Sequence, residues 1–398
     1  MKTNNQITRA GLLFTAGLLL SAAANGQELI NLGVSLPLSG SGANWGKGSE
    51  IVCQEAVRVV NANGGVKIGA KIYNYTCIAY DNKYTAADGA RVTQTLLKKD
   101  NVKFIAGNVG TAPARAMQSI TEKEGVLMFT TAWGQSIKGP KFPMTFTQMN
   151  TPVEFVESMV PFIKQANPTV KTVALLNPND ATGQDIEKIS RKTWESVGVK
   201  VLSSDWFERG TTEFQPIATK LASTKADVVD LGAAPPPDAG RIFKELKALG
   251  WKGVQVVEAG TGAEGLITTG GDASDKTYLG AAIAFDSSSS EILQRLNALV
   301  LKGTGESLNL IQLGFYDSVI ALKAAMEKAQ SIDPKVVAEA LPSIIFDGAF
   351  GKTGFGGVAS YGSPQQMLLP VIVTQINGTQ LKQVHRVENA ELAKRLAK

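Results

Sequence analysis

The sequence predicts an α/β protein made of two doubly wound parallel-sheet domains, and three observations carry this prediction. Strand-like and helix-like segments alternate almost without interruption from Leu29 to about Ala284, which is typical of parallel sheets covered by helices on both faces. The chain has 398 residues, more than a single hydrophobic core usually serves. The alternation breaks near residues 138–143 and restarts with a helix at Thr151. We therefore expect a second domain to begin there.

The first unit of this alternation shows how each element is assigned. A β-type run at residues 29–36 leads into a loop of small residues at 37–46, and an amphipathic helix follows at 46–61. The loop contains one large aromatic side chain, Trp45. A strand, an open loop and a helix in this order are how an α/β protein presents a binding crevice.

The same reasoning places the later elements. Thr85 and Asp88 resemble a capping box, and Gly198 and Gly250 follow helical runs as C-terminal caps do. Further strands are expected at residues 71–79, 103–106, 126–130, 144–148, 172–177, 200–205, 228–231, 254–257, 278–284, 344–346 and 367–376. Further helices are expected at residues 86–99, 112–124, 152–165, 183–197, 213–222, 239–249, 291–301, 308–329 and 334–341.

The N-terminal segment has the pattern of a secretion signal. Lys2 and Arg9 flank an acid-free start, an apolar run follows at residues 10–20, and small residues occupy 21–24. The alternative, a membrane anchor, is disfavoured because a spanning helix needs roughly 20 apolar residues. We expect residues 1–26 to be a signal peptide and the remainder to be exported.

Charge and cysteine content exclude several classes of function. The net charge is +5 and the basic residues are scattered, so the sequence does not indicate nucleic-acid binding. An even pair of cysteines, Cys53 and Cys77, indicates one disulfide in an exported chain. Closing a loop of about 25 residues would contribute roughly 3 kcal/mol. The rival, a catalytic or metal-binding thiol pair, lacks partners because His385 is the one histidine.

Candidate binding residues follow the early strands. The strand at 103–106 runs into Gly107-Asn108-Val109-Gly110-Thr111 before a helix, and Thr111 is placed to cap that helix. Free N–H groups at a helix N-terminus suit a carboxylate, so Asn108 and Thr111 are candidate ligand contacts. A plain capped helix explains the same residues equally well. The next expected strand, 126–130, is followed by a loop with Trp133, which with Trp45 forms candidate walls for an apolar or aromatic group.

The second half has polar or small residues after its strands, at 177–183, 232–238 and 258–262. Glu258 is a candidate partner for a ligand cation, and a solvated loop acid is the alternative. A Ser–His–Asp arrangement is not indicated, because His385 lies in a polar C-terminal segment. Phosphate-binding glycine motifs are not found either. We therefore expect a binding protein that is not an enzyme and uses no cofactor or metal.

Several of these segments resemble the type I periplasmic solute-binding proteins of ABC importers, specifically the leucine/isoleucine/valine-binding group. The matching sequences are Gly33-Val34-Ser35-Leu36-Pro37-Leu38-Ser39-Gly40, Asn61-Ala62-Asn63-Gly64-Gly65-Val66, Tyr80-Asp81-Asn82, Glu124-Gly125-Val126-Leu127-Met128, Tyr316-Asp317 and the Cys53/Cys77 pair. The resemblance implies two lobes joined by three crossovers, which close on a small molecule by hinge motion. It implies a periplasmic monomer that serves an inner-membrane ABC permease. The lobes would comprise residues 27–148 plus 285–350, and 149–284 plus 351–398.

The resemblance also assigns ligand contacts. It places Trp45 against the ligand side chain, Thr111 and Ala132 on its carboxylate, and Tyr316 at the cleft. Gly134, Thr182, Ala259 and residues 234–236 depart from the pattern of the amino-acid binders. Thr182 stands at a cleft position, and Ala259 stands where an acid would hold the ligand ammonium, one place from Glu258.

These departures leave the carboxylate site better supported than the ammonium site. The expected ligand is a hydrophobic or branched-chain amino acid or a related small carboxylate. The alternatives are an aromatic or other organic carboxylate, and a ligand-sensing subunit that serves no transporter.

Overall fold

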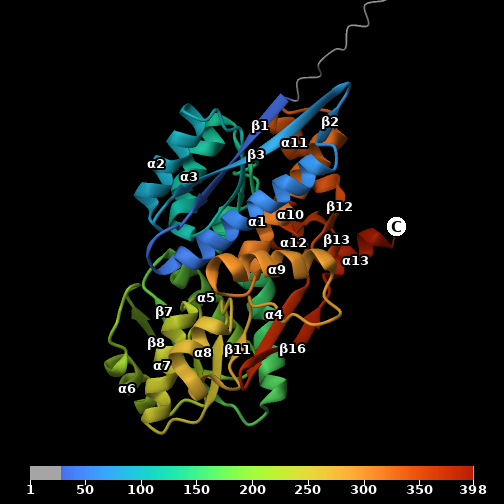
Figure 1. Ribbon diagram of the computed structural model, residues 1–398. Coiled ribbons are helices and arrows are strands. Elements are labelled where there is room, and N and C mark those ends of the chain that lie inside the picture. Colours follow the sequence, from blue (N-terminus) through green and yellow to red (C-terminus); the bar gives the residue numbers. More distant parts are fainter. Residues whose placement is uncertain (1–27, 398) are drawn as a thin grey trace, which may run out of the picture.

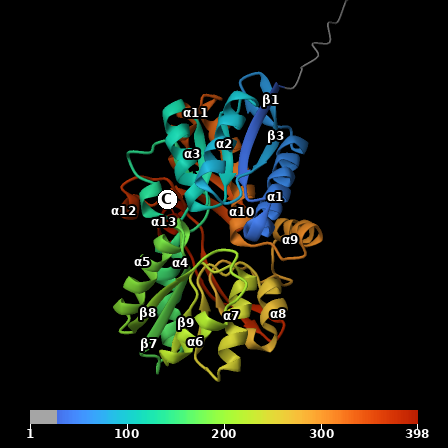
Figure 2. The same ribbon diagram turned by 90° about the vertical axis from the view of Figure 1, so that its left-hand side faces the viewer.

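The computed structural model describes residues 28–397, and it consists of two lobes stacked along the long axis of the molecule (Figures 1 and 2). The predicted signal peptide at residues 1–26 lies outside the described residues. Each lobe is a sheet with helices on both faces, as the alternation of segments predicts. Over residues 28–397, no helix has the combination of length and apolar character required to cross a bilayer.

The sheet of the first lobe, which we call lobe 1, has nine strands in the order β12-β13-β14-β6-β5-β4-β1-β3-β2. The central strands pair in parallel, whereas β2, β12 and β13 add antiparallel pairs at the two edges. The strands are β1 Glu28–Leu36, β2 Val66–Ile68, β3 Lys71–Asp81, β4 Phe104–Asn108, β5 Leu127–Thr130, β6 Thr145–Thr147, β12 Ile345–Gly348, β13 Gly351–Gly356 and β14 Gln366–Met367.

Side chains that alternate along these strands bury against different helices. In β4, Phe104 and Ala106 belong to the core under the long helices α1 and α10, whereas Ile105 faces the core under α2 and α3. This two-sided burial explains why the central strands are apolar throughout. The helices of lobe 1 are α1 Ala43–Ala62, α2 Ala86–Lys98, α3 Thr111–Glu124, α9 Glu291–Thr304, α10 Leu310–Ala329, α11 Pro334–Ala340 and α12 Val358–Tyr361.

The second lobe, lobe 2, has a seven-stranded sheet in the order β16-β15-β11-β10-β9-β7-β8. Val173 and Leu175 of β7 face the core under α4 and α5, and Ala174 and Leu176 face the core under α6, α7 and α8. The strands are β7 Thr172–Pro178, β8 Lys200–Phe207, β9 Val228–Asp230, β10 Val254–Val257, β11 Tyr278–Leu279, β15 Val371–Asn377 and β16 Gln380–Val387. The helices are α4 Pro152–Ala166, α5 Ala181–Ser196, α6 Gln215–Ser223, α7 Pro236–Ala248 and α8 Glu264–Gly270.

The chain changes from one sheet to the other three times, at residues 148–151, 280–290 and 368–370. The domain changes expected after residues 148 and 284 fall in the first two connections. The change expected after residue 350 is wrong, because β13 and β14 pair within the lobe 1 sheet. The true third connection is therefore the short segment between β14 and β15.

The C-terminal helix α13 (Ala390–Leu396) also departs from the expected assignment of residues 351–398 to lobe 2. The Arg395 guanidinium donates to the carbonyl oxygens of Pro342 at 3.0 Å and Ile344 at 3.2 Å. The backbone N–H of Gly357 donates to the Glu391 carboxylate at 2.9 Å. These contacts hold α13 beside β13, so the chain ends against lobe 1 (Figure 1).

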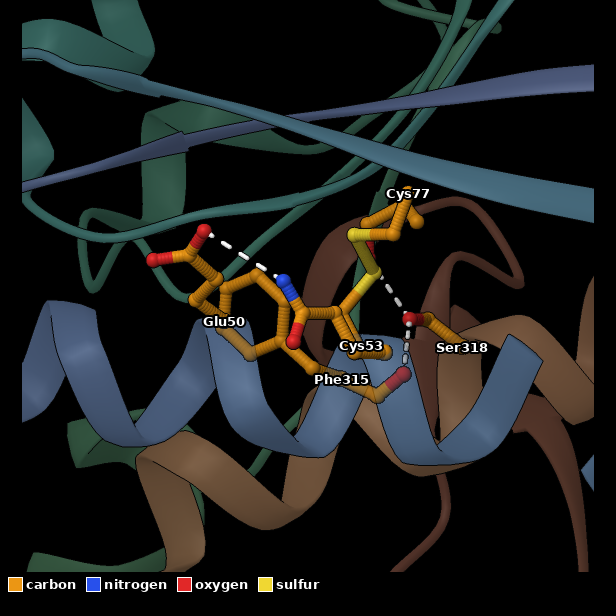
Figure 3. The surroundings of a disulfide bond; sticks show 7 residues. Glu50, Cys53, Cys77, Phe315 and Ser318 are labelled. Atoms are coloured by element: carbon orange, nitrogen blue, oxygen red, sulfur yellow. Dashed lines mark hydrogen bonds between the residues drawn. A yellow bond between two sulfur atoms is a disulfide. The ribbon is translucent and has the colours of Figure 1, made fainter. Parts of the chain in front are cut away.

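The predicted disulfide is present and joins α1 to β3 (Figure 3). Cys53 and Cys77 have Cα atoms 6.3 Å apart, and 24 positions separate them in the sequence. Figure 3 places Phe315 and Ser318 of α10 beside the bond. The Ser318 hydroxyl donates to the carbonyl oxygen of Ala106 in β4 at 2.6 Å. The disulfide therefore lies where the helix layer of lobe 1 meets its sheet.

Candidate functional site

A narrow cavity lies between the lobes, at the carboxyl ends of the central strands. Lobe 1 contributes Trp45, Tyr84, Thr111, Trp133 and Ile311 to its lining, and lobe 2 contributes Thr182, Arg209, Ala233 and Ala259. The space between their atoms is about 360 Å³, of which about 20 Å³ admits the centre of a water molecule. The lobes therefore touch almost directly, and a solute must separate them before it can enter.

Two tryptophans form part of the cavity wall. Trp45 and Trp133 are 8% and 6% exposed, and both line the cavity. Trp45 lies in the first turn of α1, because this helix begins at Ala43 and the preceding loop is shorter than expected. A Cβ atom on Gly46 would lie 2.0 Å from the carbonyl oxygen of Pro37. The glycine thus lets α1 start directly against that residue, which brings the Trp45 indole to the cleft.

Thr111 also lines the cavity, but its role in the helix differs from the one expected. Gly110, with φ of 104°, is the N-cap of α3, and Thr111 is the first helical residue. The Thr111 hydroxyl oxygen accepts the Trp133 backbone N–H at 3.4 Å and the Thr182 hydroxyl at 3.1 Å. Its hydroxyl group therefore faces the cleft beside the N-terminal end of α3, as a carboxylate contact requires.

Side chains of the two lobes hydrogen-bond directly across the cavity. The Trp45 Nε1 donates to the Thr261 hydroxyl at 3.0 Å. The hydroxyl groups of Tyr84 and Thr182 are 3.1 Å apart. Together with the Thr111–Thr182 contact, these bonds connect the first turns of α1 and α3 with lobe 2. The structure is therefore that of the closed form.

The cation in the cavity wall is Arg209, which the sequence reasoning missed. It follows β8, and its Nε donates to the carboxylate of Asp180. Both Nη atoms are buried and have no hydrogen-bond partner. The guanidinium carbon lies 4.8 Å from the centre of the Tyr84 ring in lobe 1. Within the described chain, Arg209 is the single charged residue of this lining. The signal in the sequence is its place in the loop directly after β8.

Glu258, the expected partner of a ligand ammonium, does not line the cavity. It is fully buried in lobe 2, where its carboxyl group accepts the Ser190 hydroxyl. The Asp230 carboxylate lies beside it and accepts the Trp194 Nε1–H at 2.8 Å and the Gly232 backbone N–H at 2.9 Å. Burial and the adjacent Asp230 carboxylate raise the pKa of Glu258 well above its ordinary value. The cleft position belongs instead to the neighbouring Ala259.

Three further expected contacts also lie outside the lining. Asn108 is fully buried, and its amide donates to the Gly110 carbonyl oxygen at 3.2 Å. The Ala132 backbone N–H donates to the Thr130 hydroxyl at 3.0 Å, so this group is already bonded within lobe 1. Tyr316 packs in the core of lobe 1, and Ile311 is the residue of α10 that reaches the cavity. The structure thus brings together Trp45, Thr111, Trp133 and Thr182 from the expected set.

The alternatives of a metal site and of a catalytic histidine gain no support from residues 28–397. No group of three or more His, Cys, Asp or Glu side chains in this part of the chain could hold a metal ion. The ring of His385, on β16, stacks on Phe162 with 4.4 Å between ring centres. That position is in lobe 2 and outside the cavity lining.

Comparison with known proteins gives matches over most of the chain. Residues 29–380 match a family model described as periplasmic binding protein. The leucine-, isoleucine-, valine-, threonine- and alanine-binding protein of Pseudomonas aeruginosa is 26% identical over 331 residues, covering 82% of this chain and 86% of the relative.

Solved structures share the fold at lower sequence identity. A leucine-binding protein from Thermotoga maritima has a TM-score of 0.76 at 17% identity, covering 91% of this chain and 100% of the other. A solute-binding protein of an ABC transporter from R. palustris, in complex with benzoate, also has a TM-score of 0.76 at 17% identity, with coverage of 91% and 97%. With the family match over residues 29–380, these observations lead to one conclusion: the chain belongs to the periplasmic binding protein family.

Proposed function

We propose that the protein is the substrate-binding component of an ABC importer and binds a small organic carboxylate between its lobes. In this proposal it acts in the periplasm as a monomer, delivers the ligand to an inner-membrane permease and leaves it chemically unchanged. The family membership supports the transport role. The cavity between two lobes supports binding by closure.

The observation that carries the ligand class is Arg209. Its guanidinium is held by Asp180, and its two buried Nη atoms have no partner. A buried cation with unpaired N–H groups is costly unless an anion accepts them. A carboxylate can accept both groups through parallel hydrogen bonds. Thr111 and the N-terminal end of α3 face the same cavity from lobe 1 and favour negative charge as well.

The other side chains of the cavity suit an apolar or aromatic body. Trp45, Trp133 and Tyr84 surround the site, and Ile311 adds an aliphatic contact. Aromatic rings stack edge-to-face or offset on such walls, in addition to burying apolar area. The R. palustris relative of the same fold was solved with benzoate, which is a ligand of this chemistry.

An α-amino acid is the second candidate, and the name of the P. aeruginosa relative favours it. The charges of the cavity favour a ligand without a free amine. Glu258 is turned into the core of lobe 2, and Ala259 stands in the wall. Thr111, Thr131 and Thr182 would be the hydroxyl acceptors left for an ammonium group.

A thermal-shift and calorimetric screen tests the proposal with benzoate, 4-hydroxybenzoate, leucine and isoleucine. Benzamide is the matched control, because it keeps the ring and replaces the carboxylate by a neutral amide. Binding to the folded state adds about 2.7 kcal/mol of stability at a ligand concentration 100 times the dissociation constant. We expect the aromatic acids to raise the melting temperature and benzamide to leave it unchanged. Stabilisation by leucine alone would overturn the amine-free ligand, and no stabilisation by any acid would overturn the carboxylate class.

A further inference from the structure

A single ion pair crosses from α3 of lobe 1 to α5 of lobe 2. The Nη2 of Arg115 lies 2.9 Å and 3.1 Å from the two carboxylate oxygens of Asp185. Arg115 is four residues after Thr111, and Asp185 is three residues after Thr182. Because helical neighbours recur at this spacing, the ion pair lies one turn beyond the Thr111–Thr182 contact. The two helices therefore meet through a hydroxyl pair at the cavity and an ion pair beside it.

Gly134 supplies the space in which this pair forms. A Cβ atom at Gly134 would lie 2.7 Å from both the Arg115 Nη2 and an Asp185 carboxylate oxygen. The backbone of Gly134 has φ of −66°, which any residue can adopt. Glycine at this position thus leaves room for the ion pair, although the backbone itself does not require glycine. A Cβ atom here would force at least one of the two charged groups to shift.

The ion pair also contributes to the free energy of closing the lobes. Burial raises the pKa of Asp185, and the Arg115 guanidinium opposes that shift most strongly. Lys188 lowers the pKa as well, and Asp180 raises it. Asp185 is 13% exposed, whereas Arg115 is 41% exposed. In the closed form the carboxylate is therefore much less solvated than the guanidinium, and Arg115 compensates a charge that would otherwise be largely buried.

We propose that Arg115 and Asp185 form an ionic latch that exists only in the closed form, and that Gly134 makes room for it. Neither residue lines the cavity, so both act as positioning residues that set how long the lobes stay closed. The latch rests on the proposed function in one respect, since its effect on ligand release assumes a ligand held by closure.

The latch can be tested without a ligand by fluorescence energy transfer between the lobes. Labels are attached at Lys98→Cys on α2 and Lys244→Cys on α7, which are both exposed. The native cysteines are bonded to each other and do not compete. The closed population is then measured from low to high NaCl in Arg115→Gln, Asp185→Asn, the double variant and Gly134→Ala. Arg191→Gln is the matched control, because the Arg191–Glu187 pair has exposures of 41% and 12% but lies within α5.

We expect Arg115→Gln to lower the ratio of closed to open molecules about tenfold, because it leaves Asp185 buried and unpaired. Asp185→Asn should lower it only about two- to threefold, and the double variant should resemble Asp185→Asn. Gly134→Ala should lower the ratio of closed to open molecules as Arg115→Gln does. Its melting temperature should equal that of the unmutated protein. Raising the NaCl concentration should lower the closed population of the unmutated protein and of Arg191→Gln equally, because salt screens the Arg115–Asp185 pair that both proteins retain. Closed populations that are equal in Arg115→Gln and Arg191→Gln at every salt concentration would overturn the latch.

A second measurement separates this inference from the proposed ligand class. Benzoate release is followed by stopped flow, and we expect Arg115→Gln to speed it about tenfold while association changes little. If benzoate does not bind the unmutated protein, the proposed ligand class fails. The energy-transfer measurement between the two labels still shows whether the latch exists. If benzoate binds and all variants release it at one rate, the latch is overturned and the ligand class stands.

Discussion

The two halves of the cleft are built from different kinds of contact. Lobe 1 contributes hydroxyl and aromatic groups that come directly after strands or from the first turn of a helix, with Thr111 and Trp45 as examples. Lobe 2 contributes a cation, Arg209, which depends on Asp180 and Tyr84 for its position. The first kind of contact is local in sequence, whereas the second exists only after distant segments have packed. Under the proposed function, this difference predicts that Arg209 in lobe 2 selects mainly the charge of the ligand, and that lobe 1 selects mainly its shape.

The strongest test of this division is Arg209→Gln. Removing a buried charge that pairs with a ligand carboxylate should weaken binding by about 2–4 kcal/mol. Arg209→Lys should recover part of this loss, because a lysine keeps the charge but not the planar fork. Calorimetry with the best acid from the screen measures both variants. Arg191→Gln, in an ion pair within α5, is the control and should bind normally. If Arg209→Gln binds with unchanged affinity, the ligand carboxylate must instead be bound by lobe 1.

A comparably large effect on stability, without an effect on binding, is expected at the disulfide. Both cysteines belong to lobe 1, so Cys53→Ser with Cys77→Ser should destabilise that lobe by about 3 kcal/mol. Hydrogen exchange should show faster opening in α1 and β3 and unchanged protection in the sheet of lobe 2. A uniform loss of protection in both lobes would contradict this, since it would mean that the lobes unfold as one unit.

The hydroxyl group of Thr111 provides a smaller test in lobe 1. Thr111→Val keeps the shape and removes the acceptor of the Trp133 N–H and the Thr182 hydroxyl. The loss of such bonds should weaken ligand binding by about 1 kcal/mol, roughly fivefold. Thr95→Val is a suitable control, because Thr95 is half-buried on α2 and its hydroxyl bonds only within that helix. A loss as large as that of Arg209→Gln would mean that lobe 1 carries the ligand charge.

The smallest effect on binding is expected for Glu258→Gln, which should not change the affinity. Its effect is on stability. The folded pKa of Glu258 is raised well above the ordinary value of 4.5, so the folded protein keeps a proton that the unfolded chain releases. The free energy of unfolding therefore falls as pH rises above about 4.5. Glutamine removes this loss, and the variant should gain stability relative to the unmutated protein from pH 4 to pH 8. Chemical denaturation at several pH values measures the difference.

Sequence reasoning succeeded where local pattern determines structure. The central strands and the long helices follow from apolar runs and caps, and the disulfide follows from an even cysteine count. It failed at β13, whose sequence is rich in glycine, and at β16, an exposed and polar edge strand. Both strands form because a neighbouring strand supplies hydrogen-bond partners. The short sequence of each strand does not reveal that such a partner exists.

The errors at the site have a related cause. Glu258 and Ala259 are adjacent, and a difference of one position decides which of them faces the cleft and which enters the core. In Glu208-Arg209-Gly210 the arginine has the sequence context of an exposed loop. Its burial arises from Tyr84, which is 125 positions earlier in the chain. Ion pairs and stacking of this kind arise only when the two lobes pack against each other.

The placement of the tryptophans gives the protein an optical signal of its own motion. Of the five tryptophans, Trp45 and Trp133 lie in the cleft wall, and Trp45 donates across the cleft to Thr261. Opening would bring both indole rings into water and shift their emission to longer wavelength. Trp194 is buried within lobe 2, the Trp251 Nε1 donates to the Ala226 carbonyl oxygen of the same lobe, and Trp206 is already 40% exposed. The emission of these three tryptophans therefore forms a constant background. Lobe movement should therefore be visible in the intrinsic spectrum of the unlabelled protein.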